Sequence, residues 1–332
     1  MSRTAARLGS MKNDSLHILL FGATGTIGRA TALACQNAGH RVTIVTRQAA
    51  PAAELRGCIH HIGDVTNPDD LSRIVASAPF DAIVSCLASR TGTPRDAWAI
   101  DHAAHSAILQ AALAAGIARF VQLSAICVQK PKLEFQRAKL AFEAELQRAP
   151  INWTIVRPTA FFKSLSGQIN RVQSGKPFLV FGNGQLTRCR PISDRDLGQF
   201  IAASLTDPAT NGQILPIGGP GPAISPMDQV ALLERILGHP VRVKHVPLWF
   251  MDSIIGVLSL MGRVSLRLAD QAHLARIGRY YATESMLVWD PIAKTYRADQ
   301  TPQFGHDTLE GYYTDFVSGK LSDDRGDHAV WS

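Results

Sequence analysis

Apolar runs and helical patterns alternate along the first half of the chain. Five short apolar runs are predicted to form buried strands, at residues 16–21, 41–46, 81–88, 119–125 and 152–157. Helices are predicted at residues 97–115 and 133–148, and another begins near Thr26. This alternation predicts an α/β fold, a Rossmann-type doubly wound parallel sheet with right-handed crossovers.

The pattern loosens after Pro158, where glycine-rich turns occupy residues 181–184 and 218–221. Ligands of such sheets bind beyond the carboxyl ends of the strands, so the second half is predicted to form a smaller C-terminal lobe over that edge. The predicted division is a flexible tail at 1–14, a nucleotide-binding Rossmann core at 15–160 and a substrate-binding lobe at 161–332. The lobe is expected to pack on the core rather than to fold independently.

The most apolar stretch of the chain is residues 246–264, VPLWFMDSIIGVLSLMGRV. Asp252 interrupts it, and it falls short of the length that a transmembrane helix needs. We therefore expect a core helix. A surface helix that dips into a bilayer, or a wall of a large apolar pocket, is the alternative.

A glycine-rich turn follows the first predicted strand, in the sequence GATGTIGRA. The spacing of Gly22, Gly25 and Gly28 predicts a tight turn, a close approach to a pyrophosphate, and close packing of the next helix on the sheet. The phosphates would lie against the N–H groups at the start of that helix. The expected cofactor contacts in this turn are Gly22, Thr24, Gly25, Thr26, Ile27 and Gly28.

The second predicted strand ends at Arg47 rather than at an acid. An acid there would bind the ribose 2′-OH of NAD, whereas an arginine can pair with the 2′-phosphate of NADP, so NADPH is predicted. Arg29 is a second candidate for that phosphate. Asp64, at the end of a further predicted strand between those at 41–46 and 81–88, is either an adenine contact or an ordinary turn residue. Leu87 and Ala88, at the end of the strand at 81–88, complete the expected cofactor contacts.

The composition narrows the classes of partner. The 332 residues are 46% hydrophobic and carry a net charge of +7, but the basic residues are scattered and form no aromatic–basic repeat. We therefore expect no nucleic-acid binding, and an anionic substrate or membrane surface suits the charge better. The five cysteines form no C-x-x-C pair, which argues against a zinc site or a disulfide framework and fits a reducing cytosol.

Residues 123–146 have the most informative chemistry, LSAICVQKPKLEFQRAKLAFEAEL. A short-chain dehydrogenase has a serine and a Tyr-x-x-x-Lys motif at the corresponding place. Here Ser124 and Lys139 are present, but Phe135 replaces the tyrosine. Since the tyrosine phenol donates a proton to a carbonyl oxygen, its loss implies either no catalysis or a substrate without such an oxygen.

These segments together resemble the divinyl chlorophyllide a 8-vinyl reductase family of atypical short-chain dehydrogenases. The resemblance runs from about Leu16 to Glu310. Beyond 123–146, it is strongest in VSCLASR (84–90), VRPTAFFKSLSGQ (156–168), CRPISDRDL (189–197), LPIGGPG (215–221) and ARIGRYYATESMLVWDP (275–291). The plant members have a long transit peptide that is absent here, which points to a bacterial form. The implied location is the bacterial cytoplasm or the surface of the photosynthetic membrane.

The resemblance implies NADPH-dependent reduction of the 8-vinyl group of divinyl chlorophyllide a or divinyl protochlorophyllide a in (bacterio)chlorophyll biosynthesis. Hydride would reach the outer vinyl carbon, and a proton from water or a side chain would follow. In this hypothesis Lys139 binds the nicotinamide ribose, Ser124 contacts the ribose or nicotinamide, and Phe135 presents an apolar face. These three are the expected catalytic residues.

The substrate's propionate calls for a basic partner. Arg157 and Lys163 are the first choices, and Phe161 and Phe162 would pack on the flat ring system or belong to the core. Arg190 and Lys130 are weaker basic candidates. The histidine pairs at 102 and 105 and at 60 and 61 lack a clear third ligand, so no protein-bound metal is predicted, and no flavin.

Other functions remain open at this point. A non-catalytic NADP-binding regulator explains Phe135 but not the family-specific segments of the second half. A sugar-nucleotide epimerase needs the missing tyrosine as its base. A reductase of another conjugated alkene is the third alternative. The sequence does not determine the oligomeric state.

Overall fold

The computed structural model describes residues 15–48 and 53–321. Seven strands form one sheet in the order β3-β2-β1-β4-β5-β6-β8, and every neighbouring pair is parallel. The strands are β1 (His17–Phe21), β2 (Arg41–Thr46), β3 (Ile59–Ile62), β4 (Ala82–Ser85), β5 (Arg119–Leu123), β6 (Asn152–Pro158) and β8 (Gln213–Ile217). This order confirms the predicted Rossmann-type doubly wound sheet.

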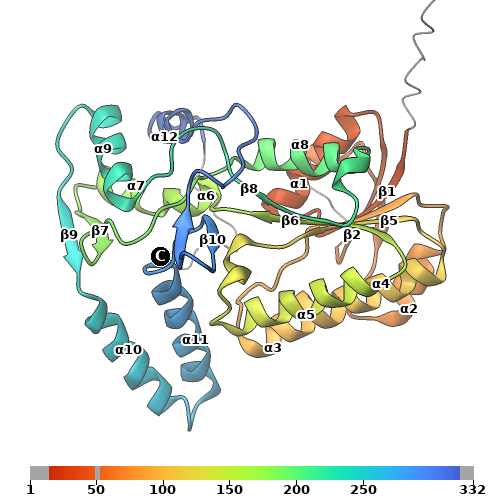
Figure 1. The fold of residues 1–332 in the computed structure, drawn as a ribbon, viewed down its shortest axis with the longest axis horizontal. Helices are drawn as coiled ribbons and strands as arrows, with labels where there is room; N and C mark the ends of the chain where they lie inside the picture. The colour runs from red at the N-terminus through yellow and green to blue at the C-terminus, as the bar shows by residue number, and fades with distance from the viewer. Residues whose placement is uncertain (1–14, 49–52, 322–332) are drawn as a thin grey trace, which may run out of the picture.

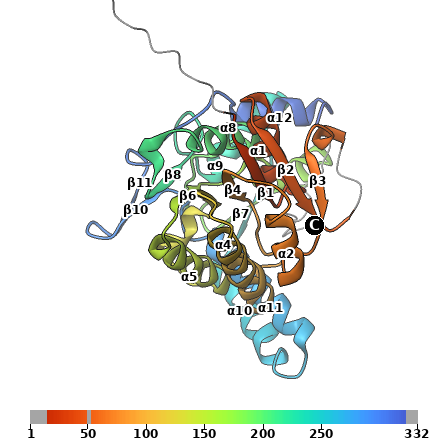
Figure 2. The same cartoon turned by 90° about the vertical axis from the view of Figure 1, so that its right-hand side faces the viewer.

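Helices cover both faces of the sheet (Figures 1 and 2). On one face α1 (Thr26–Asn37) packs against α8 (Asp194–Ser204), and on the other lie α2 (Pro68–Val75), α4 (His105–Ala114) and α5 (Glu134–Arg148). Each face has its own apolar core. A Cβ at Gly198 would lie 2.6 Å from the carbonyl carbon of Ala30, so glycine lets α8 approach α1 closely.

The helix predicted at 97–115 is longer and less regular than expected. It begins with α3 (Pro94–Ala97), continues as the π-helical segment η2 (Trp98–Ala104) and ends with α4. A π-helical turn inserts extra residues into a helix and is frequent at functional sites. Asp101 lies within η2 and is completely buried.

The second half of the chain contributes to both parts of the molecule. Its elements α8 and β8 complete the Rossmann layer, so the sheet includes residues beyond 160. The others build the lobe around a third apolar core that includes Phe162, Leu233 and Tyr313.

The remaining elements of both halves, apart from one helical hairpin, are η1 (Ala53–Leu55), η3 (Ile126–Gln129), α6 (Phe162–Leu165), η4 (Ser166–Gln168), α7 (Ile169–Gln173), β7 (Phe178–Phe181), η5 (Pro208–Thr210), α9 (Pro226–Leu237), β9 (Val243–Val246), β10 (Val288–Asp290), β11 (Thr295–Arg297) and α12 (Leu309–Val317).

The apolar stretch at 246–264 is not the core helix that we expected. It forms α10 (Leu248–Met261), which pairs with α11 (Leu266–Tyr281) in a hairpin that projects from the body (Figure 1). Met251 is the only buried residue of α10. The prediction of a helix is confirmed, but an apolar run does not reveal whether the rest of the protein covers it. Within the described ranges, no helix has both the length and the apolar content to cross a bilayer.

Candidate active site

The glycine turn after β1 has the geometry that its spacing predicts. Gly22 has a φ of 81°, and a Cβ there would lie 2.7 Å from the carbonyl carbon of Cys86. A Cβ at Gly28 would lie 2.0 Å from the carbonyl oxygen of Gly22, so α1 approaches the turn as closely as glycine allows. At Gly25 the nearest atom would be 3.5 Å away, which leaves room for a ligand beside the backbone. The predicted roles of the first and third glycines are confirmed.

The start of α1 suits an anion. No acidic residue lies in its first turn, and the Gly25 cap provides no side-chain hydrogen bond to the N–H groups there. Free N–H groups and the helix dipole both favour phosphate at this position. The Nζ of Lys163 donates to the Oγ1 of Thr26 at 3.2 Å. The structure therefore places Lys163, our candidate for the substrate propionate, at the cofactor turn.

The residues expected near the ribose and adenine lie after successive strands. Arg47 and Asp64 are exposed beyond β2 and β3, while Leu87 and Ala88 follow β4. Asp64 accepts hydrogen bonds from the backbone N–H and hydroxyl of Thr66, and these bonds lower its pKa, with a smaller contribution from the charge of Arg47. The structure thus shows Asp64 as a turn residue, which is one of the two roles predicted for it.

Arg29, the second candidate for the 2′-phosphate, lies in the first turns of α1. One Nη is 3.6 Å from Glu54, and the other donates to the carbonyl oxygen of Thr24 at 3.4 Å. Its Nε is buried without a hydrogen-bond partner among the described residues. Arg29 therefore lies against the glycine turn at Thr24 and faces Glu54 of η1.

Lys139 forms a buried ion pair that the sequence did not predict. Its Nζ donates to Oδ1 of Asp101 at 2.9 Å, and the two side chains are 8% and 0% exposed. The same oxygen accepts from the backbone N–H of Ser89 at 3.1 Å. The other oxygen, Oδ2, is buried with no partner in the described part of the chain. The only sign of this pair in the sequence is an acidic residue, Asp101, inside the helix predicted at 97–115.

A second buried ion pair lies next to the first. The Oγ of Ser124 donates to Oε1 of Glu143, and Arg157 donates through Nε at 3.2 Å to Oε1 and through Nη2 to Oε2. Glu143 is 1% exposed. Arg157, our other candidate for the propionate, is therefore engaged inside the protein. The hydroxyl proton of Ser124 is also already used.

The aromatic candidates separate into different cores. Phe135 is 9% exposed and lies in an apolar cluster with Leu133, Ile277 and Tyr280. Phe162 belongs to the lobe core, 5.6 Å between ring centres from Tyr312. Phe161 is half-buried against the core of the α1 face. The alternative of core packing is therefore observed for Phe162.

The weaker basic candidates contact the lobe. Lys130 pairs with Glu284 at 2.6 Å and lies 4.1 Å from the centre of the Trp289 ring. Arg190 donates through Nη1 to the carbonyl oxygen of Thr301 at 2.6 Å. These contacts attach the loop after β5 and the strand-like segment at 189–192 to the C-terminal part of the lobe.

The histidines point to different partners. His102 Nε2 lies 2.6 Å from Glu145, whereas His105 lies 2.9 Å from the Ser85 hydroxyl and 2.8 Å from the Ile100 carbonyl oxygen. Burial lowers the pKa of His105 to about 4, and the charge of Lys139 adds to this, so the ring is neutral. His60 and His61 contact Thr46 and Ser77. The described residues contain no group of three potential metal ligands.

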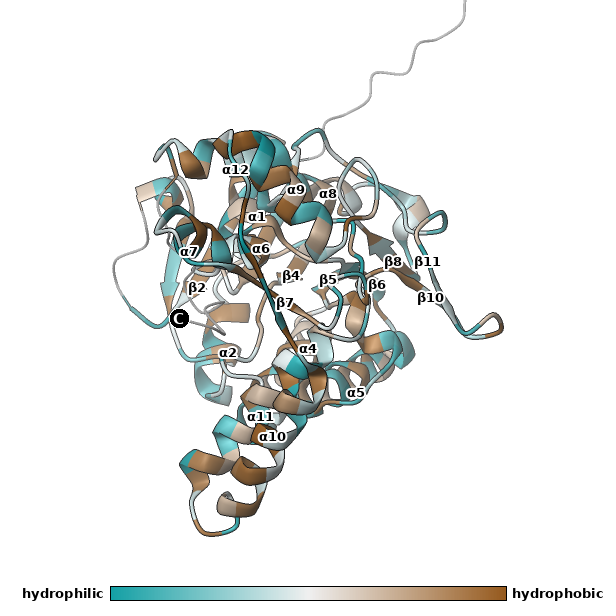
Figure 3. Ribbon diagram, turned by 90° about the vertical axis from the view of Figure 1, so that its left-hand side faces the viewer, coloured by the Kyte–Doolittle hydropathy of each residue, from teal (hydrophilic) through white to brown (hydrophobic). Residues whose placement is uncertain are grey.

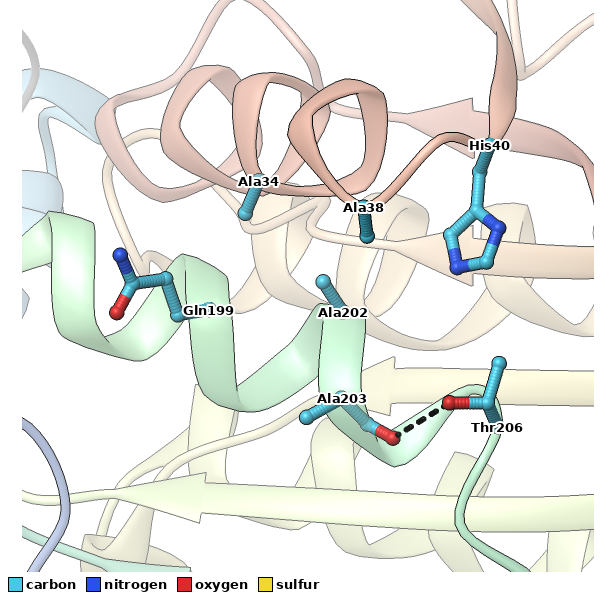
Figure 4. A pocket seen from close by; sticks show the side chains of 7 residues that line it. All are labelled: Ala34, Ala38, His40, Gln199, Ala202, Ala203 and Thr206. Atoms are coloured by element: carbon cyan, nitrogen blue, oxygen red, sulfur yellow. Dashed lines mark hydrogen bonds between the residues drawn. The ribbon is translucent and has the colours of Figure 1, made fainter. Parts of the chain in front are cut away.

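A hollow of about 250 Å³ lies away from these residues, between the carboxyl end of α1 and α8 (Figure 4). Its lining is Ala34, Ala38, His40, Gln199, Ala202, Ala203 and Thr206. The Thr206 hydroxyl is bonded to the carbonyl oxygen of Ala203 at 3.4 Å. No charged pair converges on this hollow, and it is at the opposite end of α1 from the glycine turn. It is therefore not the candidate active site.

Comparison with known proteins supports the cofactor site. The sequence family described as NAD(P)H-binding matches residues 22–208. The fold resembles leucoanthocyanidin reductase from Vitis vinifera, solved as a ternary complex, with a TM-score of 0.68 at 16% identity over 91% of this chain and 99% of that one. At this identity the likeness shows the fold alone.

Sequence relatives are much closer. The chain is 42% identical to the chloroplastic divinyl chlorophyllide a 8-vinyl-reductase of Cucumis sativus, over 95% of this chain and 80% of that protein. It is 43% identical to the enzyme of the same name from Oryza sativa subsp. indica, over 97% of this chain and 84% of that protein. The chain therefore belongs to the divinyl chlorophyllide a 8-vinyl-reductase family of NAD(P)H-binding oxidoreductases.

Proposed function

We propose that this protein reduces the 8-vinyl group of 3,8-divinyl chlorophyllide a, or of the corresponding protochlorophyllide, to an ethyl group with NADPH. The family membership supports the reaction. The observation that supports it within the site is the combination of Lys139, paired with a half-satisfied Asp101, and Phe135 in place of a phenol. A site built to protonate oxygen would need that phenol, whereas vinyl reduction ends with a proton on carbon.

NADPH, when bound, supplies a hydride to the outer vinyl carbon, and the C=C bond becomes a C–C single bond once the inner carbon takes a proton. Lys139 would hold the nicotinamide ribose, and Asp101 would fix the position of the Lys139 ammonium group. Asp101 Oδ2 would accept a hydrogen bond from a ribose hydroxyl, which satisfies the buried oxygen. Phe135 and its apolar neighbours would exclude water from the hydride path.

We further propose that the cofactor is NADPH rather than NADH, because Arg47, directly after β2, and Arg29, in the first turns of α1, could pair with a 2′-phosphate. Lys163 would then neutralise the pyrophosphate beside Thr26, since an ammonium group there faces the start of α1. Arg157 would serve as a scaffold residue, because a propionate could reach it only by displacing Glu143. A bacterial host, and action at the surface of its photosynthetic membrane, are part of the same proposal.

The test mixes the purified protein with NADPH and 3,8-divinyl chlorophyllide a. A blue shift of the Soret band and a pigment heavier by two hydrogen atoms are the expected results. NADH in place of NADPH is the matched control for cofactor choice and should react more slowly. An unchanged pigment in the presence of tightly bound NADPH would contradict the proposal and favour a non-catalytic regulator or a reductase of another conjugated alkene.

A further inference from the structure

The helical hairpin of α10 and α11 has an apolar outer face that no part of the described chain covers. The hairpin stands away from the body, and apolar residues continue to its tip (Figures 1 and 3). The exposed large apolar residues, with their exposed fractions, are Trp249 65%, Phe250 49%, Ile254 40%, Val257 58%, Leu260 64%, Met261 47%, Val264 90% and Leu266 85%. An apolar surface of this extent usually marks an interaction site.

The exposed residues form a continuous stripe along the helix. Phe250, Ile254, Val257 and Met261 follow at steps of four, three and four residues, so their side chains lie on one face of α10, and Val264 lies in the turn beyond it. The opposite face of α10 packs on α11, and an ion pair at 2.7 Å between Asp252 and Arg279 joins the two helices along one edge. The hairpin thus holds itself together and leaves one apolar face outward.

The charges at the tip itself have one sign. Residues 253–269 include Arg263 and Arg267 and no aspartate or glutamate, and Asp252 and Asp270 lie just beyond the two ends of this range. The two arginines flank Val264 and Leu266, the most exposed residues of the hairpin. A second copy of the chain on this face would bring like charges together, at a cost in binding. Anionic headgroups above an apolar layer complement both the charge and the apolar tip.

We infer that this hairpin docks the protein on an anionic membrane by inserting its apolar tip into the interfacial layer. With 14 residues, α10 is shorter than the roughly 20 residues needed to span a bilayer, so the hairpin would lie in the interface rather than cross it. Arg263 and Arg267 would remain at the level of the phosphate groups while Val264 and Leu266 lie below them.

Docking would also bring the candidate active site close to the membrane. This consequence matters for the reaction only under the proposed function. The root of α11 carries Ile277 and Tyr280, and both lie in the same apolar cluster as Phe135. Along the helix axis, about 16 Å separates Ile277 from the tip at Leu266. A docked hairpin would therefore hold Phe135 close to the bilayer, where a flat apolar macrocycle with one carboxylate concentrates.

The experiment measures sedimentation of the full chain with phosphatidylcholine vesicles, with and without about one-third phosphatidylglycerol. The tip variant carries Val264→Asp and Leu266→Asp. The matched control is Ile292→Asp, because Ile292 is 93% exposed on the turn between β10 and β11. A third variant, Arg263→Gln with Arg267→Gln, removes the charge alone.

The native chain and the Ile292→Asp variant should bind the anionic vesicles, and binding should weaken at least about tenfold in the tip variant. Loss of the arginines should weaken it about fivefold for each charge. Equal binding by the native chain and the tip variant would overturn the inference. So would a native dimer that binds no vesicles and that the tip variant dissociates. Vesicle binding without vinyl reduction in the pigment assay would contradict only the proposed function.

Discussion

Two buried ion pairs lie one helical turn apart on α5, and they differ in how completely they are satisfied. Glu143 accepts from Ser124 and twice from Arg157, so both of its oxygens have partners. In the other pair Lys139 holds only one oxygen of Asp101, and Oδ2 has no partner among the described residues. Both carboxylates are almost fully buried.

The difference indicates two roles, cofactor binding for the Lys139 pair and stabilisation of the fold for the Glu143 pair. A buried acceptor without a partner is rare because it loses the hydrogen bonds that water would give it. Such an atom is tolerated where a ligand supplies the missing bond, so the Lys139 pair is expected to face the cofactor. The closed Glu143 pair has nothing left to offer a ligand, and we expect it to hold β5, β6 and α5 together.

The Glu143→Ala variant tests most directly whether the closed pair stabilises the fold. It leaves the Arg157 guanidinium, whose side chain is only 17% exposed, without its ionic partner, and a guanidinium cannot lose its charge. We expect the free energy of unfolding to fall by about 3–5 kcal/mol. Denaturant unfolding measures this, with Glu145→Ala as the control on the same helix.

The side chain of Glu145 is 36% exposed and pairs with the half-buried His102, so its loss should cost no more than about 1 kcal/mol. Equal costs for the two variants would mean that the Glu143 cluster is not a stabilising scaffold.

The open pair should respond mainly in activity. Lys139→Met keeps the length of the side chain but removes the ammonium group that positions the ribose. We expect vinyl reduction to slow at least about 100-fold. The loss of stability should be smaller than in Glu143→Ala, because the Asp101 carboxylate keeps the hydrogen bond from the backbone N–H of Ser89.

Steady-state rates and NADPH titration together test this second prediction. Asp101→Asn is the companion variant, since it keeps an acceptor for Lys139 but loses the negative charge. It should fall between the native protein and Lys139→Met in rate. Full activity in Lys139→Met would show that the open pair does not serve the cofactor.

The same contrast separates what the sequence could and could not predict. The strands and the glycine turn follow from local patterns, because a buried parallel strand is apolar throughout and a tight turn requires glycine at defined positions. The pairing of Lys139 with Asp101 joins residues 38 positions apart and depends on the π-helical segment η2, which has no clear sequence signature. Arg157 lies at the end of β6 and Lys163 in α6 shortly after it, but the partners of both residues are set by the packing of α5 and α1.

A third ionic cluster, in the lobe, should behave like the closed pair. Burial disfavours ionisation of Glu284, but hydrogen bonds from Lys130, Lys132 and Tyr296 outweigh it and lower its pKa to about 2. The folded pKa is below the ordinary value of 4.5, so this group stabilises the protein above that value and loses its contribution as pH falls toward 2. Lys132 is 58% exposed, so solvent weakens the cluster.

We therefore expect Glu284→Gln to lower the free energy of unfolding by about 1–2 kcal/mol at pH 7. Unfolding curves of the variant and the native protein should converge between pH 4.5 and 2. A constant difference over that range would mean that the cluster stabilises through packing rather than charge.

The smallest effect is expected at Phe135, although this position first separated the chain from ordinary dehydrogenases. A Phe135→Tyr variant restores the phenol one helical turn before Lys139. If the proton is delivered to carbon, the phenol has no oxygen to protonate, and the rate of vinyl reduction should change by less than about threefold. Its hydroxyl would enter the cluster that holds Ile277 and Leu133, at a cost in stability of about 1 kcal/mol.

Phe142→Tyr is the control for adding a hydroxyl to α5, because Phe142 is completely buried in the apolar core between the sheet and the helix. It should cost more stability than Phe135→Tyr and leave the pigment reaction equally unchanged. A large gain in rate from Phe135→Tyr alone would show that a phenol does assist the reaction. The open pair at Lys139 would then be part of an ordinary dehydrogenase site that has lost its acid, rather than a site suited to protonation of carbon.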